Sequence, residues 1–420
     1  MIALEVIFYF AVLVLSLTAP YYAVLGFVLL APWNILNDAI GWDPRLGWAC
    51  IIAARAAYDA WSSQIYRIPR AALLSVAVFS GVAFAGIQFG TRNLTGDDVH
   101  SANATLLYFV VGALAAFAII QLSDSLAKLK AILISAATSI LFALAFGFLQ
   151  ASGSYASGLP SERIPGTVGN PNYFAAFLGL GATCATVLWR SKWVAPKFFL
   201  LIAVLASIMC FVTLSRMGTV ACFVGVSTAL AIRQSGKLFN IKIVLWLVAV
   251  AALGGGLAMA YLSSVRQSIT YSDNPENVRN AELSQAVEDY TRLEAAQFSL
   301  GQWLKNPIFG VGLSTVAARN YLASGLYVTS HDTYLQILAG TGLCGALLLL
   351  YFSIRCIQTV PAPGRRLLLP AVVQLALCSF FGDYMQSIDV IVLLAVLFVA
   401  ARDLPSTQLT VSTAEQICVA

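Results

Sequence analysis

Apolar runs of roughly 20 residues recur along most of the chain, and short polar segments separate them. An α-helix needs about 20 apolar residues to cross a bilayer, whereas a membrane barrel would show alternating segments of about ten. We therefore expect an all-α polytopic membrane protein of about twelve transmembrane helices. The expected spans are residues 2–16, 21–33, 71–89, 104–122, 131–149, 172–189, 197–214, 217–232, 241–262, 333–354, 367–381 and 388–401.

The first two runs and the stretch after them need separate interpretation. Ala19-Pro20 separates the first two runs, which predicts a helical hairpin. Residues 34–66 mix tryptophans with charges, and Arg55 and Asp59 have the spacing of an i,i+4 helix pair. Because tryptophan favours the membrane–water interface, we predict an interfacial helix there. A full span over residues 46–62 is the alternative.

The polar stretch 263–330 is far longer than the usual connection of about 4–6 residues. We interpret it as the working head of the protein. Apolar spacing predicts a helix over 281–304, which Asn306-Pro307 ends, and a second helix around 316–323.

Lysine and arginine gather in one set of alternate loops, which predicts that this set is cytoplasmic. Residues 263–330 fall in the other set and would face the periplasm of a Gram-negative cell. Both termini would be cytoplasmic. The basic residues are Arg67, Arg70, Lys128, Lys130, Arg190, Lys192, Lys197, Arg233, Lys237, Lys242, Arg355, Arg365, Arg366 and Arg402. The predicted parts are a bundle (1–262), a periplasmic helical loop (263–330), C-terminal transmembrane helices (331–402) and a cytoplasmic tail (403–420).

Composition supports this class and narrows the chemistry. Only 10% of residues are charged and 60% are hydrophobic, with a mean hydropathy of +0.83, whereas soluble domains carry about 25% charged residues. A net charge of +5 is accounted for by cytoplasmic loops and does not indicate nucleic-acid binding. Eight cysteines without C-x-x-C spacing and two histidines argue against a disulfide scaffold or zinc site.

Three residues could carry chemistry on the outward side. Arg216 lies in a tight turn between apolar runs, where it either anchors to lipid headgroups or grips a phosphate bidentately. Arg292 has Glu288 at i−4 and Asp289 at i−3, so it is either an exposed helix ion-pair partner or a site residue. His331 begins the return into the membrane, and an imidazole is the natural general base near neutral pH.

A glycine-rich turn at residues 166–173 leads into a predicted span. We predict that Asn172 caps this helix. A helix N-terminus on the outward side would also favour an anionic group.

Four segments together resemble motifs of the O-antigen ligase and polymerase superfamily. They are Gly169-Asn170-Pro171-Asn172-Tyr173-Phe174-Ala175, Ser215-Arg216, Arg292 with Asn306-Pro307-Ile308-Phe309-Gly310-Val311-Gly312, and His331-Asp332-Thr333-Tyr334-Leu335-Gln336 with Gly340 and Gly342. The likeness covers about residues 166–350, and the N-terminal third agrees only in hydropathy. Asp332 departs from the motif, in which asparagine is commoner.

The resemblance implies an inverting glycosyltransferase that needs no metal or other cofactor. It would move O-antigen glycan from undecaprenyl diphosphate to the lipid A–core oligosaccharide at the periplasmic face of the inner membrane. Arg216 and Arg292 would bind the diphosphate, and His331 would deprotonate the acceptor hydroxyl. Weaker site candidates are Asn172, Arg163 and Asp383, while Asp389 is undecided between structure and site.

Two relatives and one other class stay open. An O-antigen polymerase or a protein O-oligosaccharyltransferase would use the same motifs, although a single large outward loop favours the ligase. A membrane transporter would usually place charges at mid-membrane or show broken-helix repeats, whereas these charges concentrate in the outward head.

Overall fold

The computed structural model describes residues 2–34, 42–90, 94–152, 164–192, 195–213, 215–232, 293–324, 332–380, 382, 384 and 386–419. All regular elements within these ranges are helices, as predicted. They are α1 (Ile2–Thr18), α2 (Pro20–Leu30), α4 (Pro44–Ser63), α5 (Arg70–Gly90), α6 (Gly96–Leu122), α7 (Leu126–Ala151), η1 (Gly166–Val168), α8 (Pro171–Ser191), α9 (Pro196–Val212), α10 (Arg216–Ala231), α13 (Val316–Ser324), α14 (Thr333–Thr359), α15 (Ala362–Ser379) and α16 (Ile388–Val419). Residues 293–305 are also helical.

Helices α5, α6, α7, α8 and α14 are each long and apolar enough to cross a membrane. Residues 5–18, α2, α9 and α10 are shorter apolar helices. The chain is therefore a multi-pass membrane protein, while the predicted total of about twelve spans stays a prediction. The predicted span 241–262 and most of the polar stretch 263–330 lie outside the described residues. The predicted helix around 316–323 is confirmed as α13.

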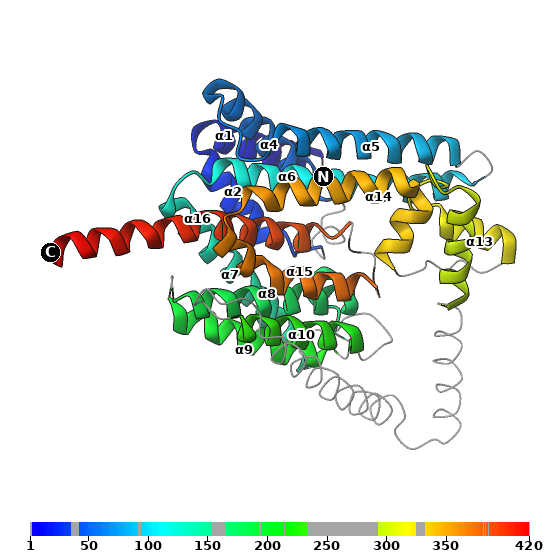
Figure 1. Ribbon diagram of the computed structural model, residues 1–420. Helices are drawn as coiled ribbons and strands as arrows, with labels where there is room; N and C mark the ends of the chain where they lie inside the picture. Colours follow the sequence, from blue (N-terminus) through cyan, green and yellow to red (C-terminus); the bar gives the residue numbers. More distant parts are fainter. Residues whose placement is uncertain are drawn as a thin grey trace, which may run out of the picture.

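Most of the helices run side by side in one bundle (Figure 1). Residues 174–188 of α8 are all buried, under α9, α10 and α15. Small residues permit this close packing. A Cβ on Gly218 of α10 would lie 2.4 Å from the Cβ of Ala175, so the two helices nearly touch where they begin.

The predicted hairpin of α1 and α2 is confirmed by contacts at both of its ends. The Tyr9 hydroxyl donates to the Asp43 carbonyl at 3.4 Å, and the Tyr21 hydroxyl donates to the Lys128 carbonyl. Arg45, next to Asp43, reaches Ala31 just after α2, so α1 and α2 run antiparallel. The side of the membrane that each terminus faces stays a prediction.

Helix α4 packs along α6 and buries one face, which includes Trp48, Ile52 and Ala56. The predicted pair of Arg55 and Asp59 forms an ion pair at 3.1 Å. The interfacial position of residues 34–66 stays a prediction.

Helix α14 is interrupted at Gly342, whose φ of 65° and ψ of −167° are not helical. Residues 307–312 fill the interruption. The N–H groups of Val311 and Gly312 donate to the carbonyls of Ala339 and Gly340 at 2.8 and 2.9 Å. In return, the N–H groups of Leu343 and Cys344 donate to the carbonyls of residues 307 and 308 at 2.8 and 3.0 Å. In an unbroken helix, the N–H groups of residues 343 and 344 would donate to the carbonyls of residues 339 and 340. Residues 307–312 replace these two hydrogen bonds of α14 with four bonds of their own.

The same segment also packs against the end of α5. A Cβ on Gly90 would lie 2.0 Å from the Val311 carbonyl oxygen, so only glycine fits there. Arg319 of α13 donates to the Gly90 carbonyl at 2.6 Å and thereby satisfies one of the exposed carbonyls at the end of α5. Burial lowers the pKa of the Arg319 guanidinium.

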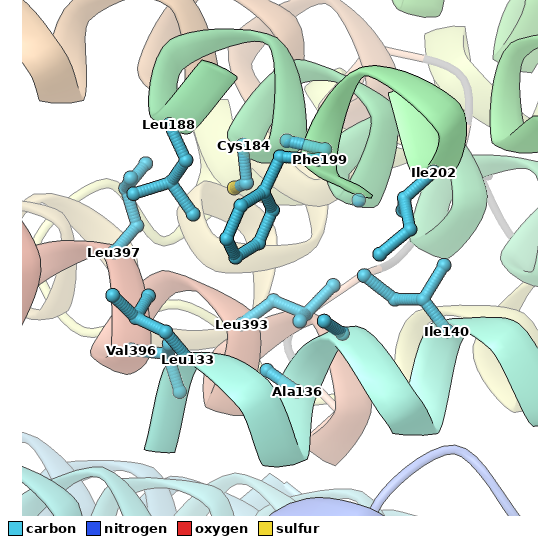
Figure 2. A pocket seen from close by; sticks show the side chains of 13 residues that line it. Leu133, Ala136, Ile140, Cys184, Leu188, Phe199, Ile202, Leu393, Val396 and Leu397 are labelled. Carbon is cyan, nitrogen blue, oxygen red and sulfur yellow. The ribbon is translucent and has the colours of Figure 1, made fainter. Parts of the chain in front are cut away.

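A small apolar cavity lies between α7, α8, α9 and α16, where Phe199 and Leu393 face one another across it (Figure 2). Its volume is about 20 Å³. A space of that size holds about one water-sized group, so this cavity is a packing gap and not a ligand site.

Candidate functional site

The start of α8 is fixed by Asn170, not by Asn172 as predicted. The Asn170 Oδ1 accepts the N–H groups of Asn172 and Tyr173 at 2.9 and 3.4 Å. Asn170 has the extended backbone of an N-cap (φ −140°, ψ 125°), and Pro171 follows at the first helical position, where its missing N–H matters least. The predicted cap was therefore two residues too late, and the Asn172 side chain is used elsewhere.

Asn172 joins the start of α8 to the start of α10. The Ser215 hydroxyl donates to Asn172 Oδ1 at 3.0 Å. Ser215 is also the N-cap of α10, since its Oγ accepts the Gly218 N–H at 3.4 Å. Arg216 is the first residue of α10 and is partly exposed. Two motifs about 40 residues apart are thus joined by a hydrogen bond beside the arginine that the sequence singles out.

The start of α14 is connected to the start of α8 through the segment between α15 and α16. The Thr333 hydroxyl donates to the Gly382 carbonyl at 2.6 Å and accepts the Tyr384 N–H at 3.1 Å. The Tyr384 ring meets the Tyr173 ring edge-on, with centroids 5.4 Å apart. Burial raises the pKa of the Tyr384 phenol well above its ordinary value, so this hydroxyl is neutral at physiological pH.

Asp332 is the N-cap of α14, where its carboxylate accepts the Leu335 N–H at 3.0 Å. Burial raises the pKa of Asp332, because the charged form loses hydration. Asparagine would supply the same acceptor oxygen without a charge, so the departure from the commoner motif residue leaves the cap intact.

We call this end of the bundle the motif end: the place where Pro171, Arg216 and Thr333 begin α8, α10 and α14. Each helix N-terminus carries about half a positive charge. The starts of α8 and α10 lie together beside the Arg216 guanidinium, which makes this part of the motif end electropositive, whereas the Asp332 carboxylate offsets the charge at the start of α14. Backbone N–H groups at helix starts suit an anionic oxygen. The arrangement is chemically fit to bind a multiply charged anion such as a diphosphate.

The structure brings together some of the predicted site residues. Arg216 and Asn172 both lie at the motif end. Arg292, His331, Arg163 and Asp383 lie outside the described residues, and their roles stay predictions. Asp389 is only 1% exposed at the start of α16, so it belongs to the protein interior and does not line an open site.

Sequence reasoning gave no role to Thr333 or Tyr384. A hydroxyl residue directly after the His-Asp pair at a helix start is a weak signal for Thr333. Tyr384 lies between two predicted spans and carries no local signal, because its contacts come from residues far away in the chain.

In a comparison with protein families, a family model described as O-antigen ligase matches residues 201–350. The matched region contains Ser215-Arg216, the 307–312 segment and the first part of α14. It does not include the start of α8 or Tyr384, which the fold brings to it. A comparison with curated proteins found no match.

Proposed function

We propose that the chain is an O-antigen ligase-type enzyme that transfers a glycan from a polyprenyl diphosphate to a second glycan at the membrane surface. The family match over residues 201–350 supports this proposal. The finer assignment is the O-antigen ligase reaction. In it, O-antigen leaves undecaprenyl diphosphate and joins the lipid A–core oligosaccharide at the periplasmic face of the inner membrane.

The observation that carries the proposal is the hydrogen bond between Ser215 and Asn172. It holds the N-termini of α8 and α10 together beside Arg216, so a guanidinium and two helix dipoles serve the same anion. Thr333 and Tyr384 link the start of α14 to the same cluster, directly after His331 in the sequence. A diphosphate leaving group is the part of such a donor that this positive charge would bind.

In the proposed reaction, Arg216 and Arg292 hold the diphosphate oxygens. As the glycosidic bond breaks, the bonding electron pair moves onto the diphosphate, and the two guanidinium groups stabilise that growing charge. His331 takes the proton from the acceptor hydroxyl, whose oxygen attacks the anomeric carbon from the opposite side and inverts it. A diphosphate leaves without a proton donor, so the reaction does not need the paired carboxylates of a glycoside hydrolase.

The test replaces Arg216, Arg292 and His331 singly by alanine. Removing one group that stabilises the transition-state charge should lower transfer by about 10²–10³-fold. Lipopolysaccharide from a ligase-null strain carrying each variant would be examined by gel, with protein level checked in the membrane fraction. Arg355→Ala is the matched control, because Arg355 lies near the far end of α14. Normal laddering with Arg216→Ala would contradict the proposal.

The same gel separates the two relatives within the superfamily. Loss of a ligase leaves long glycans on the lipid carrier, whereas loss of a polymerase leaves lipopolysaccharide capped with a single repeat. Only the first pattern, restored by the wild-type chain, supports the ligase assignment.

A further inference from the structure

A buried ion pair lies just behind the motif end. Arg45 is 3% exposed, and its Nε and Nη2 donate to the two carboxylate oxygens of Asp43 at 2.9 and 2.6 Å. Its remaining terminal nitrogen donates to the Ala31 carbonyl at 2.9 Å and to the Asn34 side-chain oxygen. The guanidinium thus fixes the backbone after α2 and the side chain of Asn34 at once.

Asn34 is also hydrogen-bonded to the segment that leads into α8. Its Nδ2 donates to the Val168 carbonyl at 3.2 Å. Val168 ends η1, and Gly169, with φ of 80°, turns the chain directly into the Asn170 cap. Two residues later, Asn172 accepts the hydrogen bond of Ser215, the cap of the helix that Arg216 begins.

Stability alone does not account for this arrangement. A buried ion pair adds little net stability compared with apolar residues of the same volume, since both charges lose their hydration. Its directional hydrogen bonds instead fix geometry. Here, through Asn34, they fix the Val168 carbonyl, which lies two residues before the Asn170 cap of α8.

We propose that Arg45 and Asn34 are positioning residues for the diphosphate site, and that they act through residues 168–172 on Arg216. This inference rests on the proposed function, because it assumes that Arg216 binds the donor. It extends the site to the N-terminal third of the chain, which lies outside the matched region 201–350.

The sharpest variant is Asn34→Asp. The aspartate keeps an oxygen for Arg45 but places its second carboxylate oxygen against the Val168 carbonyl, so the bond to Val168 is replaced by a repulsion. Loss of one such bond should raise the KM for the donor roughly five- to tenfold. The kcat should fall as well, because Arg216 also stabilises the charge that grows on the leaving diphosphate, whereas the KM for the acceptor should stay unchanged. Asn103→Asp in α6, which starts from a partly buried asparagine, is the matched control.

The assay uses the purified full-length chain in detergent, with undecaprenyl diphosphate-linked glycan and lipopolysaccharide core extracted from a ligase-null strain. Arg45→Lys is the second variant, because an ammonium keeps the charge beside Asp43 but loses the planar fork that also reaches Ala31 and Asn34. It should raise the donor KM in the same direction.

A double-mutant cycle with Arg216→Lys decides the matter. If Asn34 acts through Arg216, the two effects on donor KM will be less than additive. Additive effects, or a donor KM for Asn34→Asp equal to that of Asn103→Asp, would overturn the positioning role while leaving the proposed function intact. Full transfer by Arg216→Ala would instead overturn the proposed function, and this inference with it.

Discussion

Gly90 lies where α5, the 307–312 segment and α13 meet, and its replacement by alanine tests the whole junction. The added Cβ would lie 2.0 Å from the Val311 carbonyl oxygen and 2.9 Å from its carbon. That carbonyl is held by the Thr315 hydroxyl at 3.0 Å, so it cannot rotate away without losing a hydrogen bond. Gly81, on the same helix, has nothing within 4 Å of the equivalent position and is the matched control.

The size of the effect follows from these contacts. Forcing one methyl group into a packed junction costs about 1–3 kcal/mol. Moving α5 away from α13 also weakens the bond from Arg319 to the Gly90 carbonyl, which contributes about 1 kcal/mol more. We expect Gly90→Ala to lose about 2–4 kcal/mol in total. Gly81→Ala should be neutral or gain up to about 1 kcal/mol from helix propensity.

The measurement is thermal unfolding of both variants in detergent by tryptophan fluorescence, together with glycan transfer. Gly90→Ala should unfold at a clearly lower temperature and lose transfer in parallel. Should the two alanine variants unfold at the same temperature as the wild type, the junction is not packed as described and the reasoning fails.

Two further predictions concern the motif end. Asp332 has a raised pKa when folded, so its favourable contribution is complete below its unfolded pKa of about 3.9 and is lost as the pH rises through the folded value. Asp332→Asn should therefore raise the unfolding midpoint at pH 7 and leave it unchanged near pH 3, as unfolding scans at both pH values would show. Ser215→Ala should lose about 1–2 kcal/mol, since it removes an N-cap and the bond to Asn172, whereas Ser215→Thr should recover most of it. Equal unfolding midpoints for the alanine and threonine variants would contradict that role.

The helices were predictable because hydropathy decides them. The five candidate spans all fall on predicted runs, and α5 and α8 begin and end within a few residues of the prediction. The prediction extends less well to helix ends: α16 continues to Val419, well past the expected end at 401. Hydropathy identifies the residues that can lie in the bilayer, but it does not show where a helix ends beyond the bilayer.

The sequence predicted which segments form the site, but it did not predict the hydrogen bond that joins them. Motif resemblance placed Asn172 and Arg216 in one site, but the sequence gave Asn172 the capping role that belongs to Asn170. Pro171 was the available signal, because proline prefers the first helical position and so places the cap just before it. The bond from Ser215 to Asn172 depends on how α8 packs against α10, which no local pattern reports.

Arg45 was missed for the same reason. Asp43-Pro44-Arg45 could have been recognised as a helix start, with Asp43 as its cap and Pro44 at the first position. Its connection to Asn34 and Val168 crosses more than 130 residues of sequence. Such long-range pairing is set by the tertiary fold alone.

The interruption of α14 has a consequence for how the protein assembles. Gly342 is the tenth residue of the helix, about 14 Å from its start, which is deep enough to lie in hydrocarbon. Backbone groups left unpaired there cost several kcal/mol each, and lipid offers them no partner. During biosynthesis, α14 alone would be an incomplete membrane segment that matures only when the stretch synthesised before it folds back onto it. The 307–312 segment and α14 would then acquire their final structure in a single cooperative step.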